Sequence, residues 1–331
     1  MGEQLTIAFL GGIPPLLGGG GLEIQMARQQ AALEALGHVV VRAECAAPDV
    51  RPDVLHVFGS EPDAWHRLRH WRRNHCPLVL TPVLTVSPGA EERALRLAAR
   101  LPGPMTSARM KRELLARADL VLPLTAYERS LAVDVLGADP ARVEVLPNGL
   151  EPVAPLGRDA LPATVPAGPY GLLLGRIEPR KGQARVLAAS DGSVPLVVAG
   201  GLEGDDEARA GWERLVTRTG AAWLGELHDR ELVATLEHHA AALVLLSETE
   251  VQSRAALESL AQGTPVIASD IPAHRELRDA YPQHVLLARA ATDVPPLLRR
   301  IASEPRPTPA PSVPTLAETT ERLAAAYRRL L

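Results

Sequence analysis

The sequence predicts an α/β protein built from two domains, each with a parallel sheet, and two observations carry this prediction. Short apolar segments alternate with segments of helical periodicity in residues 5–146, and the same alternation restarts in residues 171–269. A proline-rich stretch without periodicity, residues 147–169, separates the two runs. Continuous apolar strands between helices are typical of parallel sheets covered on both faces. We therefore expect two facing domains with a cleft between them, lined by the carboxyl ends of the strands.

The elements follow from the pattern in chain order. The first half predicts helices at 22–36, 90–100, 108–117 and 126–136, and strands at 5–10, 38–43, 53–58, 77–81, 119–124 and 142–146. The second half predicts helices at 181–190, 206–218 and 229–239 and a further helix that ends at 262. Its predicted strands are 171–176, 195–200, 221–225, 241–246 and 265–269. A second proline run, 305–314, precedes a last helix at 315–331. The expected domains are 1–150 together with helix 315–331, a linker or hinge at 151–169, and 170–314.

Composition excludes several classes of protein. The 331 residues are 46% apolar and carry a net charge of −4, so no excess of positive charge points to nucleic acid. No run reaches the roughly 18 apolar residues that a membrane span needs, and the first residues lack a signal-peptide pattern. Two cysteines cannot build a disulfide framework, so we expect a cytoplasmic protein.

Two segments that follow first strands suit an anion. The glycine-rich residues 11–21 lie between the first strand and first helix, where backbone N–H groups can hold a phosphate, although GxGxxG spacing is absent. Arg176 ends the first strand of the second half and Lys181 opens the next helix, and a guanidinium with an ammonium there suits a diphosphate. The alternatives are a flexible loop and two surface cations. Lys181 is one of only two lysines, which favours the ligand hypothesis.

A third segment, SETEVQSRAALESLAQGTPVIASD at 247–270, contains two glutamates eight residues apart. If both were helical they would lie about 80° apart, so we expect Glu250 in a loop and Glu258 within the helix. Amides near 251–254 would then face a phosphate, and the carboxylates would accept hydrogen bonds from sugar hydroxyls. The alternative is a capping box, Ser247-x-x-Glu250, at the start of the helix. Arg254 could also pair with Glu258, four residues on.

Together these segments resemble the retaining, nucleotide-sugar-dependent glycosyltransferases of group one, which have the GT-B fold. The resemblance rests on four motifs in a fixed order: Gly18–Gly21; Pro147-Asn148-Gly149; Gly175-Arg176-x4-Lys181; and Ser247-x-x-Glu250-x7-Glu258 followed by Ala261–Val266. It covers nearly the whole chain. It implies two facing Rossmann-like domains and a C-terminal helix that crosses back to the N-terminal, acceptor-side domain.

The resemblance also implies roles for individual residues. Arg176 and Lys181 would hold the donor diphosphate without a metal or cofactor, and Glu250 would bind hydroxyls of the donor sugar. Glu258 would bind the ribose. The remaining donor-binding residues would be Gly18, Gly19, Gly20, Gly21, Gly175, Val251, Gln252, Ser253 and Arg254. The expected donor is a UDP-sugar, GDP-sugar or related nucleotide-diphospho-sugar, and the acceptor a sugar, glycolipid or small molecule. Apart from the resemblance, the arginines within residues 64–76 would form a basic face, which would allow weak peripheral contact with the inner face of the membrane.

Two departures from the family pattern affect the sugar side. Many relatives place a histidine after the fourth strand, whereas residues 79–89, VLTPVLTVSPG, contain none. Relatives commonly have Gly-Phe-Gly after the first motif glutamate, whereas this chain has Val251–Ser253. A nucleotide-sugar-binding protein without transferase activity therefore remains an alternative, as does a nucleotide-sugar epimerase of the same fold.

Other polar clusters favour structural interpretations. His66, His70, His75 and Cys76 lie among arginines, which repel a metal ion, so we expect a solvated face there and no metal site. Asp205-Asp206 is typical of a helix start, and His238-His239 of a helix end, where a cation suits the helix dipole.

Overall fold

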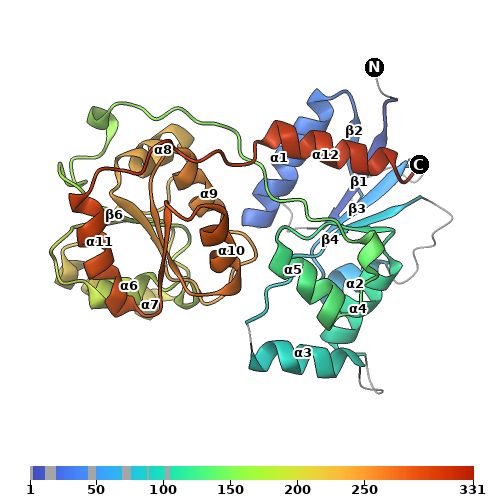
Figure 1. Cartoon of the computed structure of the whole chain (residues 1–331), viewed down its shortest axis with the longest axis horizontal. Coiled ribbons are helices and arrows are strands. Elements are labelled where there is room, and N and C mark those ends of the chain that lie inside the picture. The colour runs from blue at the N-terminus through green and yellow to red at the C-terminus, as the bar shows by residue number, and fades with distance from the viewer. Residues whose placement is uncertain (1–2, 12–19, 44–49, 69–75, 88, 101–104) are drawn as a thin grey trace. The chain divides into compact units, whose positions relative to one another are not determined.

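The computed structural model describes residues 3–11, 20–43, 50–68, 76–87, 89–100 and 105–331. The chain divides into two compact units, Met1–Glu151 with Pro314–Leu331, and Pro152–Val313 (Figure 1). Among the described residues, no helix is both long and apolar enough to cross a membrane.

The first unit contains a parallel sheet of five strands in the order β2-β1-β3-β4-β5. The strands are β1 (Thr6–Gly11), β2 (Val39–Arg42), β3 (Val54–Phe58), β4 (Leu78–Thr81) and β5 (Leu120–Val121). The helices are α1 (Gly21–Ala35), α2 (Pro62–Leu68), α3 (Ala90–Arg100), α4 (Ser107–Arg117), α5 (Ala126–Ser130) and α12 (Leu316–Arg328). Successive β1 residues belong to cores on opposite faces of the sheet, which is the alternation that a doubly covered parallel sheet requires.

The second unit contains a parallel sheet of six strands in the order β11-β10-β9-β6-β7-β8. The strands are β6 (Gly171–Leu174), β7 (Leu196–Ala199), β8 (Ala222–Trp223), β9 (Ala242–Leu245), β10 (Val266–Ser269) and β11 (Val285–Ala288). The helices are α6 (Gln183–Ala189), α7 (Asp206–Thr219), α8 (Arg230–His239), α9 (Arg254–Ala261), α10 (Pro272–Ala280) and α11 (Val294–Ser303). Leu172 and Leu173 of β6 belong to cores on opposite faces.

The last helix, α12, belongs to the first unit, where it packs on α1 (Figure 1). Thr315 and Glu318 form a capping box at its start, with N–H···O distances of 2.9 and 3.2 Å. Leu150 forms a parallel β-bridge with Thr315, just before the helix. A Cβ on Gly149 would lie 2.2 Å from the Thr319 hydroxyl. The Pro147-Asn148-Gly149 motif therefore needs its glycine so that the backbone can approach α12.

Some expected elements differ from the observed ones. The strand expected at 142–146 is wrong: after a 3₁₀ turn at Pro140–Arg142, only Val143 forms a bridge, to Val121. The strand expected at 119–124 keeps two residues, because Pro123 cannot donate a ladder hydrogen bond. The helix expected at 126–136 becomes a π-helix over Leu131–Val135. The elements α10, β11 and α11 were absent from the sequence prediction.

Candidate functional site

The candidate site lies at the carboxyl edge of the second sheet. Strands β10, β9 and β6 are neighbours there and all run parallel, so their carboxyl ends meet at one edge. The segments that follow them carry most of the sequence-predicted site residues. Such an edge is where open α/β sheets bind ligands.

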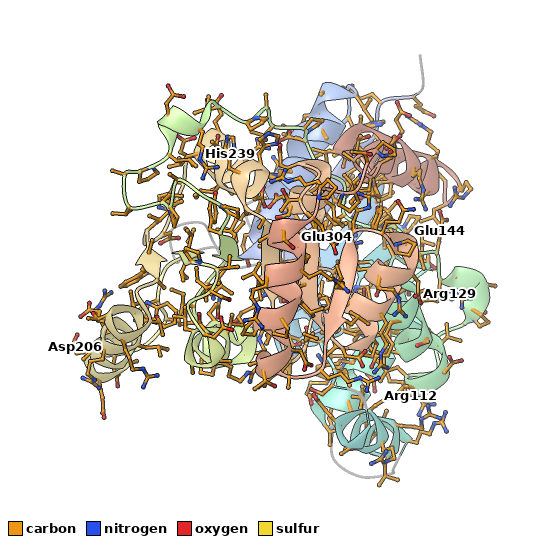
Figure 2. All side chains as sticks on the ribbon, turned by 60° about the vertical axis from the view of Figure 1, so that its left-hand side comes forward. Arg112, Arg129, Glu144, Asp206, His239 and Glu304 are labelled. Carbon is orange, nitrogen blue, oxygen red and sulfur yellow. The ribbon has the colours of Figure 1, made fainter. Side chains whose placement is uncertain are left out.

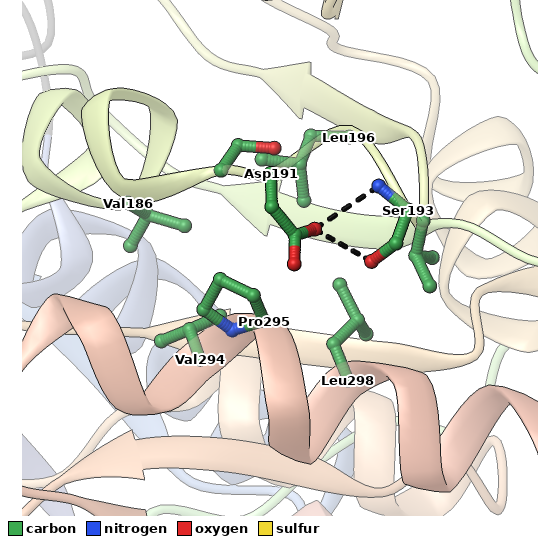
Figure 3. A pocket seen from close by; sticks show the side chains of 9 residues that line it. Val186, Asp191, Ser193, Leu196, Val294, Pro295 and Leu298 are labelled. Atoms are coloured by element: carbon green, nitrogen blue, oxygen red, sulfur yellow. Dashed lines mark hydrogen bonds between the residues drawn. The ribbon is translucent and has the colours of Figure 1, made fainter.

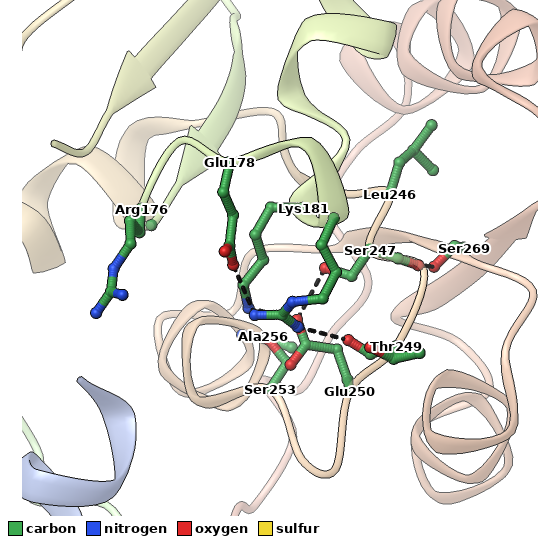
Figure 4. Close-up of polar contacts among 12 residues, drawn as sticks. Arg176, Glu178, Lys181, Leu246, Ser247, Thr249, Glu250, Ser253, Ala256 and Ser269 are labelled. Carbon is green, nitrogen blue, oxygen red and sulfur yellow. Dashed lines mark hydrogen bonds and ion pairs between the residues drawn. The ribbon is translucent and has the colours of Figure 1, made fainter. Parts of the chain in front are cut away.

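Lys181 and Glu250 form an ion pair at this edge (Figure 4). The Lys181 ammonium lies 2.6 Å from the Glu250 carboxylate, which also accepts a 2.8 Å hydrogen bond from the Ser247 hydroxyl. The two side chains are 26% and 10% exposed. Burial alone would raise the pKa of Glu250, but the Lys181 charge and the Ser247 hydroxyl outweigh burial and lower that pKa. Glu250 is therefore ionised at neutral pH.

Three hydrogen bonds and an ion pair hold the 246–250 loop against Arg180, which precedes α6, and Arg185, which lies on α6. Arg180 donates to the Thr249 carbonyl at 3.0 Å, and its own carbonyl accepts from the Glu248 N–H at 2.9 Å. Arg185 donates to the Leu246 carbonyl at 2.8 Å and pairs with Glu248. The loop is thus fixed by side chains from a segment about 65 residues earlier in the chain.

Gly182 makes this close approach possible. Its φ is +75°, and a Cβ there would lie 2.4 Å from the Leu246 carbonyl oxygen. Only glycine avoids both the strain and the clash. The expectation that Lys181 opens the helix is wrong. Lys181 ends a 3₁₀ turn at Pro179–Lys181, and α6 begins at Gln183.

The capping-box alternative for Ser247 and Glu250 is wrong. Helix α9 begins at Arg254, and its N-cap is Ser253, whose hydroxyl accepts from the Ala256 N–H at 3.4 Å. Ser247 instead donates to Glu250, whose carboxylate faces Lys181. The expected positions of both glutamates are confirmed: Glu250 lies in the loop and Glu258 on the helix.

Glu258 and Arg176 each form an ion pair with a residue other than Lys181 or Glu250. Arg254 lies 3.0 Å from Glu258, one helical turn away, so this pair forms as the sequence allowed. Arg176 follows Gly175, which adopts a φ of +119°, and its half-exposed guanidinium lies 3.4 Å from Glu203. Its side chain points away from the Lys181–Glu250 pair (Figure 4). A shared diphosphate site for Arg176 and Lys181 stays a prediction.

The glycine-rich loop belongs to the first unit. Gly18 and Gly19 lie outside the described residues. Gly20 precedes α1 and Gly21 is its first residue. The Gly20 N–H donates to the Glu23 carboxylate at 2.7 Å, so a residue of the helix itself uses one of the donors that the sequence offers to an anion.

The other polar clusters of the sequence have structural explanations where they are described. Asp205 caps α7 by accepting from the Ala208 N–H at 2.9 Å, and His239 ends α8 (Asp206 and His239 are labelled in Figure 2). His66 is exposed on α2, whereas His70 and His75 lie outside the described residues. Within the described ranges, no group of three or more His, Cys, Asp or Glu residues could hold a metal ion.

A small pocket elsewhere in the second unit is too small for a substrate. It has a volume of about 10 Å³ and is lined by side chains that include Asp191, Ser193 and Leu298 (Figure 3). That volume is at the lower limit for one water molecule.

Comparisons with known proteins match both halves of the chain to glycosyltransferase families. Residues 166–293 match the model of the glycosyl transferases group 1, and residues 31–149 match a glycosyl transferase 4-like domain. The chain belongs to the group 1 glycosyltransferases.

Curated relatives include two proteins named D-inositol 3-phosphate glycosyltransferase. The one from Stackebrandtia nassauensis is 30% identical over 255 residues, covering 70% of this chain and 56% of the relative. The one from Thermomonospora curvata is 29% identical over 296 residues, covering 81% and 67%. The chain therefore spans just over half to two thirds of the length of these relatives.

Solved structures share the fold of this group 1 glycosyltransferase. Sucrose-phosphate synthase from Thermosynechococcus elongatus superposes with a TM-score of 0.69 at 20% identity, over 98% of this chain and 95% of that one. Anabaena HepE superposes with a TM-score of 0.65 at 16% identity, over 98% and 95%. Together with the two parallel sheets, these neighbours show a two-domain, Rossmann-like GT-B fold.

The sequence prediction missed two residues next to the ion pair of this glycosyltransferase. Ser269, at the end of β10, donates to the Ser247 carbonyl at 2.5 Å. His274, in the first turn of α10, is buried, and its Nδ1 lies 3.1 Å from both the hydroxyl and the carbonyl oxygen of Ser269. Burial lowers the pKa of His274, and the Glu250 charge opposes that shift. The signal available was a histidine shortly after the 265–269 strand, in residues 270–304, where the sequence pattern predicts no element.

Glu237 is a buried carboxyl close enough to Glu258 to be affected by its charge. Glu237 of α8 is 2% exposed and accepts a 3.1 Å hydrogen bond from the Ser259 hydroxyl. Burial, and then the negative charge of Glu258, raise the pKa of Glu237 well above its usual value. The environment of Glu237 therefore favours its neutral form, and a neutral Glu237 does not repel the Glu258 carboxylate.

Proposed function

We propose that this chain transfers a glycosyl group from a nucleotide-diphospho-sugar to an acceptor hydroxyl, with retention of anomeric configuration and without a metal. The proposal rests on its membership of the group 1 family and on one structural observation. That observation is the partly buried Lys181–Glu250 ion pair at the carboxyl edge of the second sheet.

The pair supplies both charges that the reaction needs. When the glycosidic bond to the diphosphate breaks, negative charge develops on the leaving phosphate, and a fixed ammonium at Lys181 stabilises it. The Glu250 carboxylate accepts hydrogen bonds from donor-sugar hydroxyls. The clamped 246–250 loop keeps both groups in place before the donor arrives, so little reorganisation is needed.

The remaining residues complete the proposed donor site. Glu258 binds the ribose hydroxyls, backbone amides of residues 251–254 face the diphosphate at the start of α9, and Arg176 turns from Glu203 toward the diphosphate. Gly175 gives the backbone room beside the donor.

The proposed reaction balances without any further reactant. The acceptor oxygen bonds to the anomeric carbon on the face from which the diphosphate leaves, and the bond from that carbon to the phosphate oxygen breaks. The acceptor proton passes to the leaving diphosphate oxygen, so no histidine is needed as base. This accommodates the absence of histidine from residues 79–89.

Relatives suggest which substrates to test first. HepE was crystallised with UDP-glucose, and a trehalose-6-phosphate structure from E. coli holds UDP-2-fluoro glucose. UDP-sugars are therefore the first donors to examine, followed by GDP-sugars. The names of the curated relatives make inositol 3-phosphate the first acceptor.

Replacing Lys181 tests the proposal. The chain is incubated with radiolabelled UDP-glucose, in EDTA, with and without acceptor, and released UDP and labelled product are measured. Lys181→Met should lower turnover at least about a hundredfold, because oxyanion-stabilising groups contribute that much. Lys111→Met is the matched control, since Lys111 is the only other lysine and pairs with Glu61 in the first unit.

The outcomes separate the competing hypotheses. Transfer that requires Lys181 and gives a product of retained configuration by NMR supports the proposal. Tight binding of a UDP- or GDP-sugar without turnover by the unmodified chain would instead support a nucleotide-sugar-binding protein. Inversion at C2 of the donor sugar would support an epimerase. Equal turnover by Lys181→Met and Lys111→Met would reject the assigned role of Lys181.

A further inference from the structure

A hollow lies between α6 and α7 of the second unit. It has a volume of about 670 Å³, within the range of small-molecule sites. Its lining residues come from one face of each helix: Ala184, Arg185 and Ala188 of α6, and Gly211, Arg214, Leu215 and Arg218 of α7. We call it the α6–α7 groove.

The charge of the groove is entirely positive. Three of its seven lining residues are arginines and none is acidic. Within the part of the chain that the structure describes, Arg214 and Arg218 form no ion pair, although Arg209 on the same helix lies 4.0 Å from Glu213. Two arginines one helical turn apart, opposite a third, offer several donors to one anion.

The other lining residues favour a compact ligand. Ala184, Ala188 and Gly211 have small or absent side chains, so a phosphate can approach between the helices without displacing bulky groups. Leu215 offers an apolar contact to the rest of a ligand. A guanidinium binds phosphate in a bidentate manner, which makes a phosphorylated small molecule the best chemical match.

Arg185 connects the groove to the candidate site. Arg185 lines the groove, and its guanidinium pairs with Glu248 and donates to the Leu246 carbonyl at 2.8 Å. The loop that it holds carries Ser247 and Glu250. A phosphate in the groove would compete with Glu248 for Arg185 and loosen this loop.

We propose that the α6–α7 groove is a second anion site, which binds a phosphorylated small molecule and weakens donor binding through Arg185. Occupation of the groove stands on its lining residues alone. The effect on donor binding rests in addition on the proposed function. By linkage, the donor weakens phosphate binding in the groove by the same factor.

Inorganic phosphate is the probe for occupation. Its binding to the full chain is followed by ³¹P NMR titration, alone and with the donor site filled by excess UDP. Arg214→Ala/Arg218→Ala should weaken phosphate binding at least about tenfold, because two charged donors are lost. Arg209→Ala/Arg67→Ala is the charge-matched control: it removes two exposed arginines, one from α7, and should leave binding within about twofold.

The results discriminate clearly. Equal weakening in both double variants, or no binding by the unmodified chain at tens of millimolar phosphate, would overturn the second site. For the coupling, UDP affinity is measured at increasing phosphate. Phosphate should weaken UDP binding more in the unmodified chain than in Arg214→Ala/Arg218→Ala, where only direct competition at the donor site remains. Identical phosphate dependence in the two proteins would reject coupling. If UDP does not bind at all, the proposed function fails while the groove titration still reports on occupation.

Discussion

Acidification should destabilise the first unit through one buried histidine. His56 lies on β3 with no exposed surface, and its ring nitrogens lie 2.6 Å from the Tyr327 hydroxyl and 2.9 Å from the Thr81 hydroxyl. It stacks on Phe58 at a centroid distance of 4.0 Å. Burial lowers its pKa from 6.5 to about 3. His56 thereby joins α12 to the sheet as a neutral, fully buried hydrogen-bonding group.

The sign and size of the effect follow from linkage. Between pH 6.5 and about 3 the unfolded chain protonates this histidine and the folded chain does not, so stability falls as the pH falls. The contribution is fully present above pH 6.5. Each pH unit below it removes about 1.4 kcal/mol, so acidification to pH 5 should remove about 2 kcal/mol of unfolding free energy.

Urea unfolding at pH 7.5, 6.5 and 5 measures this loss, with circular dichroism and tryptophan fluorescence to show whether the two units unfold separately. The pKa of His274 is also lowered, whereas that of Glu237 is raised, and acidification affects their contributions in opposite directions. A His56→Gln variant isolates the term, because its pH slope should be shallower by about 1.4 kcal/mol per unit.

NMR provides a test that does not depend on the variant folding. The ring signals of His56 should not shift between pH 8 and 5, because its pKa of about 3 lies below that range. A His56 signal that titrates near pH 6.5 would refute the reasoning, as would equal pH slopes for the unmodified chain and His56→Gln.

Further predictions concern the second unit. Glu250→Gln should lower turnover with little effect on nucleotide affinity. Glu258→Ala should weaken UDP binding at least about tenfold in calorimetry. If Glu258→Ala instead left the affinity unchanged and removed only about 0.5 kcal/mol of stability, Glu258 would serve only its ion pair with Arg254 on the helix surface. Arg176→Ala should weaken UDP binding by at least about 1.5 kcal/mol, and unchanged titration curves for UDP and GDP would remove Arg176 from the site. Gly182→Ala should destabilise the second unit by more than about 3 kcal/mol, because a Cβ there meets a backbone carbonyl oxygen at 2.4 Å. Gly220→Ala is its control: φ is +67° but nothing lies within 4 Å, so about 1 kcal/mol should be lost in the same urea titration.

The regular elements could largely be predicted because their signals are local. Buried strands such as Leu196–Ala199 are continuous apolar runs, and α7 begins at an aspartate cap that the sequence displays. The exceptions depend on distant residues. Val143 pairs only with Val121, so the apolar run around it never becomes a strand. The apolar–polar alternation of residues 142–146 is the same as that of an observed strand, and the available pairing partner determines whether a strand forms.

The sequence singled out two side chains that the structure brings into contact, but not the geometry of that contact. The order of the motifs identified Lys181 and Glu250, whereas their 2.6 Å contact joins residues 69 positions apart and leaves no local pattern. The role of His274 is equally non-local, because it reaches the ion pair only through Ser269 and Ser247.

The start of α9 shows how a local rule fails in the presence of a distant charge. Ser247-x-x-Glu250 satisfies the capping-box pattern, and Ser253 offers a second N-cap six residues later. A capping glutamate must turn back to its own helix terminus, but the only lysine of the second unit lies within reach of Glu250. The Glu250 carboxylate pairs with that ammonium, the helix begins at Arg254 with Ser253 as its N-cap, and Glu250 remains in the loop. Because Glu250 is held by Lys181 and not by the helix terminus, residues 251–253 precede α9, and both charges that the proposed reaction requires lie outside that helix.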